Sequence, residues 1–195
     1  LVTLPVCVDG TCRAGQSDCF RFGVTAGQRI AIEVVTRQIG SAMDPFIRLL
    51  DASGHVLATA DDGPAGPECR LKHVFAAAGE ALLEVRHSAH QGGMAYHLRI
   101  GDFPIVSHAL PLAVRPGTTT HVSFGGLDAA AVEPVAVVVP SAFADGGRLV
   151  AARLPGGRSS AWVPVLVHDA PQLVEPPENE SVPLPVGISG RLAKP

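Results

Sequence analysis

The sequence predicts an all-β protein built from two consecutive β-sandwiches. Short segments alternate apolar and polar residues and are separated by turn residues, which is typical of strands. Hydrophobic residues make up 47% of the 195-residue chain, whereas only 17% are charged and 5% aromatic, and 21 glycines and 17 prolines punctuate it. No segment combines helical periodicity with capping residues. Many short strands without helices indicate sandwich architecture.

The first half of the chain carries a regular series of candidate strands. Residues 29–35 show the pattern most clearly, because apolar and polar side chains alternate after the turn Ala26-Gly27-Gln28. The predicted strands are 19–24, 29–35, 46–50, 55–58, 71–75, 81–85 and 96–100.

Several motifs in this half follow one another in a characteristic order. They are Gly15-Gln16-Ser17-Asp18-Cys19-Phe20-Arg21-Phe22, Ala26-Gly27-Gln28, Asp44-Pro45-Phe46-Ile47-Arg48-Leu49-Leu50-Asp51, Gly54, Asp61-Asp62, Gly79 and Tyr96-His97-Leu98. This series resembles the bacterial pre-peptidase C-terminal (PPC) domain, although Gln16, Cys19 and Ala81 depart from the family pattern. The resemblance implies a jelly-roll-like sandwich over residues 1–101, of the kind appended to secreted enzymes and large surface proteins.

Residues 102–170 differ in texture and predict a second, smaller sandwich. Its candidate strands are 103–106, 120–124, 135–139, 149–152 and 162–167, separated by glycine-containing turns. This part is similar to the immunoglobulin-like module that follows PPC domains in large secreted proteins of planctomycete-type bacteria.

The end of the chain predicts a linker and the start of another module. Residues 171–181 (PQLVEPPENES) are rich in Pro and Glu, which favours a semi-rigid extended spacer. Residues 182–195 then nearly repeat the beginning, since Leu184-Pro185-Val186 matches Leu4-Pro5-Val6 and Gly190 matches Gly10. We interpret 182–195 as the first strand of a next PPC-like repeat. Chance similarity of a short apolar segment is the alternative.

Four cysteines, Cys7, Cys12, Cys19 and Cys69, allow three pairings. If Asp9-Gly10 forms a two-residue hairpin turn, Cys7 faces Cys12 closely enough for a disulfide, and Cys19 is left to pair with Cys69. If residues 6–13 instead form one continuous strand, positions 7 and 12 point to opposite faces and cannot pair. Two disulfides would indicate an oxidising compartment, hence an extracellular, periplasmic or cell-surface location.

Composition and motifs argue against several functional classes. The formal net charge is −3, with no clustered Lys and Arg of the kind that binds nucleic acid, and no apolar run is long enough to span a membrane. The chain contains no G-x-S-x-G, no H-E-x-x-H and no phosphate-binding glycine loop. We therefore expect that the protein is not an enzyme.

Two groups of residues are candidate metal ligands. Asp61 and Asp62, with Asp18, supply oxygen ligands suited to calcium, although Asp residues at such positions also cap turns. His87 and His90 form a weaker candidate for a transition metal, the alternative being an ordinary exposed loop. No cofactor other than calcium is expected.

These observations predict a non-catalytic extracellular binding or spacer module of a larger secreted or surface protein. It would tether that protein to polysaccharide or to a protein partner, beside neighbouring repeat modules of the same polypeptide. The alternative is a structural subunit of a fibre or complex that assembles when residues 182–194 add as a strand to a neighbouring copy.

Overall fold

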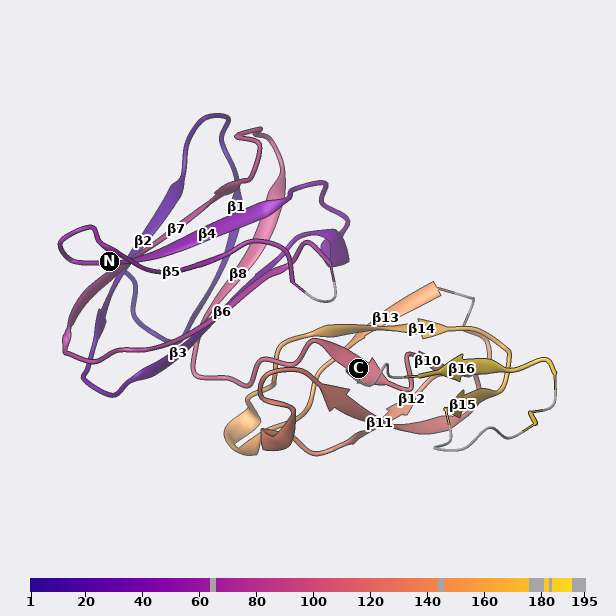
Figure 1. Ribbon diagram of the computed structural model, residues 1–195. Coiled ribbons are helices and arrows are strands. Elements are labelled where there is room, and N and C mark those ends of the chain that lie inside the picture. Colours follow the sequence, from indigo (N-terminus) through magenta and orange to yellow (C-terminus); the bar gives the residue numbers. More distant parts are fainter. Residues whose placement is uncertain (64–65, 144–145, 176–180, 183, 191–195) are drawn as a thin grey trace. The chain divides into compact units, whose positions relative to one another are not determined.

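The computed structural model describes residues 1–63, 66–143, 146–175, 181–182 and 184–190. The chain divides into two compact units, Leu1–Ile105 and Val106–Pro195 (Figure 1). The division falls after residue 105 rather than after the expected residue 101. The reason is that Phe103 is buried, with the Arg99 guanidinium 3.6 Å from the centre of its ring, so this segment packs with the first unit.

The first unit consists, in its described part, of two four-stranded sheets with the orders β1-β8-β3-β6 and β2-β7-β4-β5. Strand β1 pairs with β8, β2 with β7, β3 with β6 and β4 with β5, all antiparallel. This nested pairing is that of a long antiparallel ribbon rolled into two facing sheets, which is the jelly-roll topology. The predicted jelly-roll-like sandwich is therefore confirmed. The strands are β1 (Val6–Thr11), β2 (Asp18–Val24), β3 (Arg29–Val35), β4 (Pro45–Asp51), β5 (Val56–Ala60), β6 (Cys69–Val74), β7 (Gly79–His87) and β8 (Ala95–Gly101).

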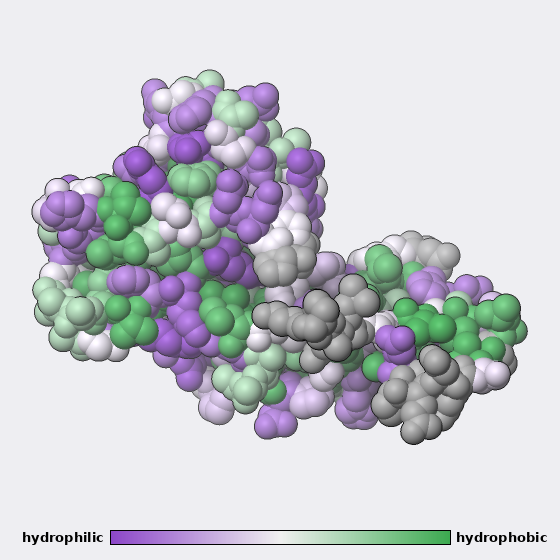
Figure 2. All heavy atoms as spheres, viewed as in Figure 1, coloured by the Kyte–Doolittle hydropathy of each residue, from purple (hydrophilic) through white to green (hydrophobic). Residues whose placement is uncertain are grey.

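The core of the first unit lies between its two sheets. In β7, Ala81, Leu83 and Val85 are buried while the residues between them are partly exposed, because successive side chains of a strand point to opposite faces. Figure 2 shows hydrophilic and hydrophobic residues interspersed over the visible face of this unit. The apolar residues of the alternating pattern in β7 therefore face the interior between the two sheets.

Strand β3 is buried on both faces and carries a charged side chain inside. Glu33 is 1% exposed and accepts a hydrogen bond from Arg70 on β6 at 3.0 Å. On its other side Arg99 of β8 approaches to 3.2 Å. Glu33 stands directly opposite both arginines in the strand register, so the three strands carry a buried Arg–Glu–Arg row. A buried carboxylate is tolerated only with such partners.

The predicted hairpin at Asp9-Gly10 is wrong. Residues Val6–Thr11 form the continuous strand β1, and Gly10 lies opposite Tyr96 of β8. A β-carbon at position 10 would lie 2.3 Å from Cζ of the Tyr96 ring. The glycine therefore marks a close approach of an aromatic ring rather than a turn.

The predicted disulfides are corrected as a consequence, because all four cysteines are unpaired in the structure. Cys7 and Cys12 are separated by an odd number of positions, so Cys7 is exposed and Cys12 is buried. Cys19 is exposed on β2 of one sheet, whereas Cys69 is buried on β6 of the other. In neither predicted pair do the two sulfur atoms lie on a common face. The cysteines therefore give no argument for an oxidising compartment.

A thiol titration checks this arrangement. In the native protein we expect Cys7 and Cys19 to react with a thiol reagent at least about tenfold faster than Cys12 and Cys69, because reaction requires an accessible thiolate. Burial raises the pKa of the Cys69 thiol strongly, which slows it further. All four thiols should react after denaturation without reductant. If no thiol reacts in the denatured, unreduced protein, the two predicted disulfides are present after all.

The second unit contains, in its described part, two three-stranded sheets with the orders β10-β14-β13 and β12-β11-β9. Val163, Val165 and Val167 of β14 are buried and alternate with exposed residues, as in the first unit. The all-β prediction is confirmed here also, and the immunoglobulin-like identity of this unit stays a prediction. Residues 103–106 are not a strand. The strands are β9 (His108–Leu110), β10 (Ala113–Val114), β11 (Thr119–Gly125), β12 (Val135–Val138), β13 (Gly146–Val150) and β14 (Val163–Val167).

Part of the predicted linker is a strand. Gln172–Val174 forms β15, which pairs in parallel with β16 (Gly187–Ser189). The Ser189 hydroxyl accepts a hydrogen bond of 2.9 Å from the backbone N–H of Leu112, so this segment belongs to the second unit. That 182–195 begins another module stays a prediction, and residues 176–180, 183 and 191–195 lie outside the described residues.

The helical turns among the described residues are short 3-10 turns, and none of them is long enough to cross a membrane.

Candidate functional site

Three carboxylates meet at one end of the first unit. One oxygen from each of Asp44, Asp61 and Asp62 lies within 4.8 Å of the others. Asp44 immediately precedes β4, and Asp61 and Asp62 immediately follow β5. Because β4 and β5 are antiparallel neighbours, the start of one strand adjoins the end of the other, and this pairing brings the carboxylates together.

Neighbouring groups hold this acidic cluster (Asp44, Asp61 and Asp62) in place. The Ser88 hydroxyl donates to Oδ2 of Asp44 at 2.5 Å, and the Ser88 backbone N–H donates to the Asp44 carbonyl at 2.8 Å. The Cys69 thiol donates to the carbonyls of Pro45 and Asp61, at 2.7 and 3.1 Å. Burial, followed by the charges of Asp61, Asp44 and Asp62, raises the pKa of Cys69. The sulfur is therefore a protonated donor to the backbone beneath the cluster.

The donor set suits a hard divalent cation. Carboxylate oxygens are the ligands that calcium prefers, and three like charges so close together repel unless a cation neutralises them. Asp61 and Asp62 were predicted from the sequence, whereas Asp44 was not chosen as a ligand. The hairpin formed by the segments around residues 46–50 and 55–58 could have revealed it, since a register that pairs Ile47 with Ala60 brings the residue before β4 and the residues after β5 to the same end of the hairpin.

Asp18 does not join the cluster. It lies on β2, which β7 and β4 separate from β5, so three strand spacings of about 4.8 Å place it about 14 Å from Asp61. Its Oδ2 accepts a hydrogen bond of 2.7 Å from the hydroxyl of Tyr96, which is 2% exposed. Burial raises the pKa of Tyr96. Asp18 thus serves as the partner of a buried tyrosine.

The two predicted histidine ligands have different environments. His87 is 6% exposed at the end of β7, and its Nδ1 accepts a hydrogen bond from the backbone N–H of Ala89 at 2.9 Å. His90 is exposed in the following turn, with a φ of 56°. Among the described residues, neither belongs to a group of three or more His, Cys, Asp or Glu side chains that could hold a metal.

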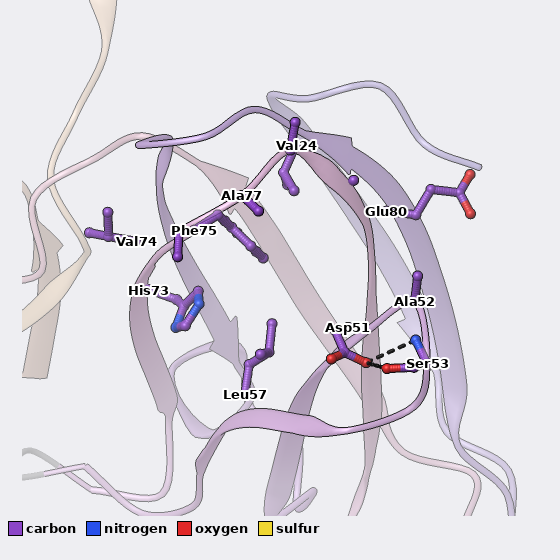
Figure 3. Close-up of a pocket in the computed structure, with 13 residues that line it drawn as sticks. Val24, Asp51, Ala52, Ser53, Leu57, His73, Val74, Phe75, Ala77 and Glu80 are labelled. Carbon is purple, nitrogen blue, oxygen red and sulfur yellow. Dashed lines mark hydrogen bonds between the residues drawn. The ribbon is translucent and has the colours of Figure 1, made fainter.

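A hollow of about 490 Å³ lies at the opposite end of the β4–β5 hairpin from the acidic cluster. Figure 3 shows Leu57, His73 and Phe75 pointing toward it from β5, β6 and the segment after β6. Asp51 lies at its edge, and Glu80 points away from it. Neither the hollow nor its lining was predicted from the sequence, although the run Ala76-Ala77-Ala78 was visible there.

The turn beside this hollow holds Asp, Ser and His side chains together. Oδ1 of Asp51 accepts hydrogen bonds from the backbone N–H and hydroxyl of Ser53, at 2.9 and 2.7 Å, and from the backbone N–H of His55 at 3.0 Å. The Ser53 hydroxyl bond first, and then the other donors, lower the pKa of Asp51 to about 2. Nδ1 of His55 contacts both Ser53 and Asp51, at 2.9 and 3.3 Å. A catalytic triad instead uses the two different ring nitrogens of its histidine, so this group is a turn cap.

A second hollow, of about 300 Å³, lies in the second unit between β12 and β13. The guanidinium of Arg148 crosses from β13 to donate to the Val138 carbonyl at 3.0 Å. Trp162, which is 37% exposed, contributes to its wall. The side chains of this hollow carry no acidic group among the described residues, in contrast to the hollow of the first unit.

Three domains are among the solved structures that are similar to this chain. The pre-peptidase C-terminal domain of a collagenase from Bacillus anthracis is similar over 50% of this chain and 89% of its own, with 19% identity and a TM-score of 0.42. PliG of Aeromonas hydrophila, a periplasmic inhibitor of g-type lysozyme, matches over 49% of this chain and 83% of its own, with 11% identity and a TM-score of 0.40. The Yersinia pseudotuberculosis-derived mitogen matches over 50% of this chain and 86% of its own, with 16% identity and a TM-score of 0.39. No family model and no curated protein matches the chain.

Proposed function

We propose that this protein is a non-catalytic extracellular binding or spacer module of a larger protein, with a calcium ion held by Asp44, Asp61 and Asp62 in its first unit. The observation that carries the proposal is the convergence of these three carboxylates at one end of a jelly-roll sandwich. Among the described residues, the side chains that most resemble a catalytic group are those of Asp51, Ser53 and His55, and they cap a turn.

The cation would contribute stability and local order. Asp44 reaches the cluster from one strand end, and Asp61 and Asp62 reach it from the next, so a bound ion cross-links the start of β4 to the end of β5. Calcium sites of extracellular modules have dissociation constants of about 10⁻⁴–10⁻³ M. A site of this affinity binds calcium in the concentration range in which extracellular modules operate.

Calcium is expected to raise the melting temperature of the first unit. At 10 mM calcium, a site of that affinity adds about 1.4–2.7 kcal/mol, which corresponds to about 5–15 °C for a domain of this size. The double substitution Asp61→Asn and Asp62→Asn should abolish the shift. Differential scanning calorimetry with calcium or magnesium alone measures it.

The control is Asp9→Asn, which removes one exposed carboxylate on β1 away from the cluster and should leave the calcium shift intact. Without calcium, the double variant should be as stable as the parent or more so, because it loses like-charge repulsion. Equal shifts in parent and double variant would place the calcium effect elsewhere and refute the site.

Binding is tested by co-sedimentation of the purified chain with insoluble polysaccharides and cell-wall fractions, and by titration against extracellular matrix proteins. We expect retention by one of these classes, and reduced retention when calcium is chelated. Absence of retention by every class would leave a spacer role and remove the tethering function.

The alternative of assembly by strand addition is less well supported. Residues Gly187–Ser189, which would supply part of the exchanged strand, pair with Gln172–Val174 of their own chain. Their release would sacrifice this pairing together with the Ser189–Leu112 hydrogen bond.

A further inference from the structure

The hollow of the first unit is distinct from the acidic cluster, because the two lie at opposite ends of the same hairpin. Asp44 and Asp62 flank the open end of β4 and β5, whereas Asp51 and His55 stand at its closed end. A ligand in the hollow (Figure 3) therefore does not compete with a cation at the cluster.

The sequence explains why this end of the roll stays open. The connection from β6 to β7 contains Ala76, Ala77 and Ala78, whose methyl groups are too short to fill the space between the sheets. Phe75 is 5% exposed and forms an apolar wall, with the His73 ring packed edge-on at 4.7 Å. Leu57 remains 36% exposed on the other side. The volume of about 490 Å³ lies within the usual range for ligand pockets.

The hollow has an acidic group at its edge, the carboxylate of Asp51. Glu80 is also a lining residue, although its side chain points away, and the described lining contains no Lys or Arg. Arg21 lies nearby, in an adjoining hollow of about 190 Å³ that shares Asp51 and Glu80. Asp51 remains ionised through the physiological range, because the hydrogen bonds of its turn lower its pKa to about 2.

We propose that this hollow binds the side chain of a lysine or arginine from a protein partner, with the aliphatic stem on Leu57 and Phe75 and the cationic head at Asp51. This inference rests on the proposed function as a binding module and names the chemistry of its partner. Oδ1 of Asp51 already accepts three hydrogen bonds within the turn, whereas the approach of Oδ2 to His55 is the longer contact, at 3.3 Å. Oδ2 is thus the oxygen that accepts from the ligand.

A side chain with an apolar stem and a charged end fits better than a wholly apolar ligand. An uncharged group would cover the apolar wall but would also shield the Asp51 carboxylate from water without replacing its hydration. Lysine and arginine bury their methylene groups and keep the cation at the rim, which matches both features.

The test is a titration followed by methyl NMR of the whole chain. The probes are the N-acetyl methylamides of lysine, arginine and norleucine, and the reporters are the methyl groups of Leu57 and Ala76–Ala78. We expect the lysine and arginine probes to shift these methyls with a dissociation constant of about 1 mM, as befits small fragments. Norleucine, which has a similar alkyl stem without charge, should bind at least about tenfold more weakly.

Two substitutions separate charge from shape. Asp51→Asn keeps an oxygen to accept the hydrogen bonds of the turn but removes the charge, and should weaken the lysine probe about tenfold while leaving norleucine unchanged. Ala77→Phe adds a ring at the exposed loop and should abolish binding of all probes by filling the hollow. Asp9→Asn is the matched charge control and should leave binding unaltered.

Each outcome decides the inference. Equal binding of norleucine and lysine, or no methyl shift at about ten times the expected dissociation constant, overturns it. Shifts that survive Ala77→Phe also overturn it. The titration needs neither calcium nor a natural partner. It can therefore fail while retention on polysaccharide or matrix protein still supports the proposed function. Conversely, the probes can bind the hollow while no polysaccharide or matrix protein retains the chain.

Discussion

Replacement of Glu33 by glutamine is expected to destabilise the first unit by about 3–5 kcal/mol, because it removes the buried negative charge that two largely buried guanidinium groups face. The side chains of Glu33 and Arg70 are 1% and 7% exposed, and that of Arg99 is 15% exposed. Burial already lowers the pKa of Arg99, and the Glu33 charge opposes that effect. Loss of the carboxylate therefore removes the group that makes this burial tolerable.

The effect is measurable on the first unit separately. The chain has one tyrosine and one tryptophan, and Tyr96 lies in the first unit whereas Trp162 lies in the second. Urea denaturation followed by near-ultraviolet circular dichroism of Tyr96 and fluorescence of Trp162 reports the two units individually. Glu33→Gln should lower the midpoint of the tyrosine transition.

The matched control is Glu84→Gln, which breaks a cross-strand pair with Arg48 on the outer face of the other sheet. The side chains of this pair are 18% and 43% exposed, so its loss should cost at most about 1 kcal/mol. A loss of less than about 1 kcal/mol for Glu33→Gln would show that the buried row contributes no more than an exposed pair. Joint replacement of Glu33, Arg70 and Arg99 by apolar residues should recover most of the stability.

Truncation of Phe22 to alanine is expected to cost about 3–5 kcal/mol, because it opens a cavity between the two sheets of the first unit. Phe22 lies on the inner face of β2 and is fully buried, at 0% exposed. The same denaturation of Tyr96 measures the change. Phe22→Leu should cost less, since it leaves a smaller cavity.

Phe46→Ala provides the comparison. Phe46 lies on β4 with only partial burial, and the Arg86 guanidinium stacks 4.3 Å from the centre of its ring. Its removal should cost about 1 kcal/mol, the loss of one partly exposed cation–π contact. Equal costs for the two phenylalanines would contradict the placement of the core between the sheets.

The location of most strands followed from the sequence. The predicted strand 29–35 coincides with β3 (Arg29–Val35), and the other predicted strands of the first unit agree within a few residues. Period-2 alternation is a local property that burial of one face imposes on each strand separately. The same local signal placed Asp61 and Asp62 in a turn, where their carboxylates were available as ligands.

The tertiary structure decided what each segment lies against. Asp9-Gly10 reads locally as a turn, but the ring of Tyr96, far along the chain, requires a glycine within a strand. Gln172–Val174 reads as a spacer, yet Gly187–Ser189 returns to pair with it. Asp18 was predicted as a ligand and Asp44 was not, and only the strand order placed Asp44 beside Asp61 and Asp18 against Tyr96. Alternation therefore determined which residues face inward, whereas the partners of those residues depended on contacts between distant segments, which no local pattern encodes.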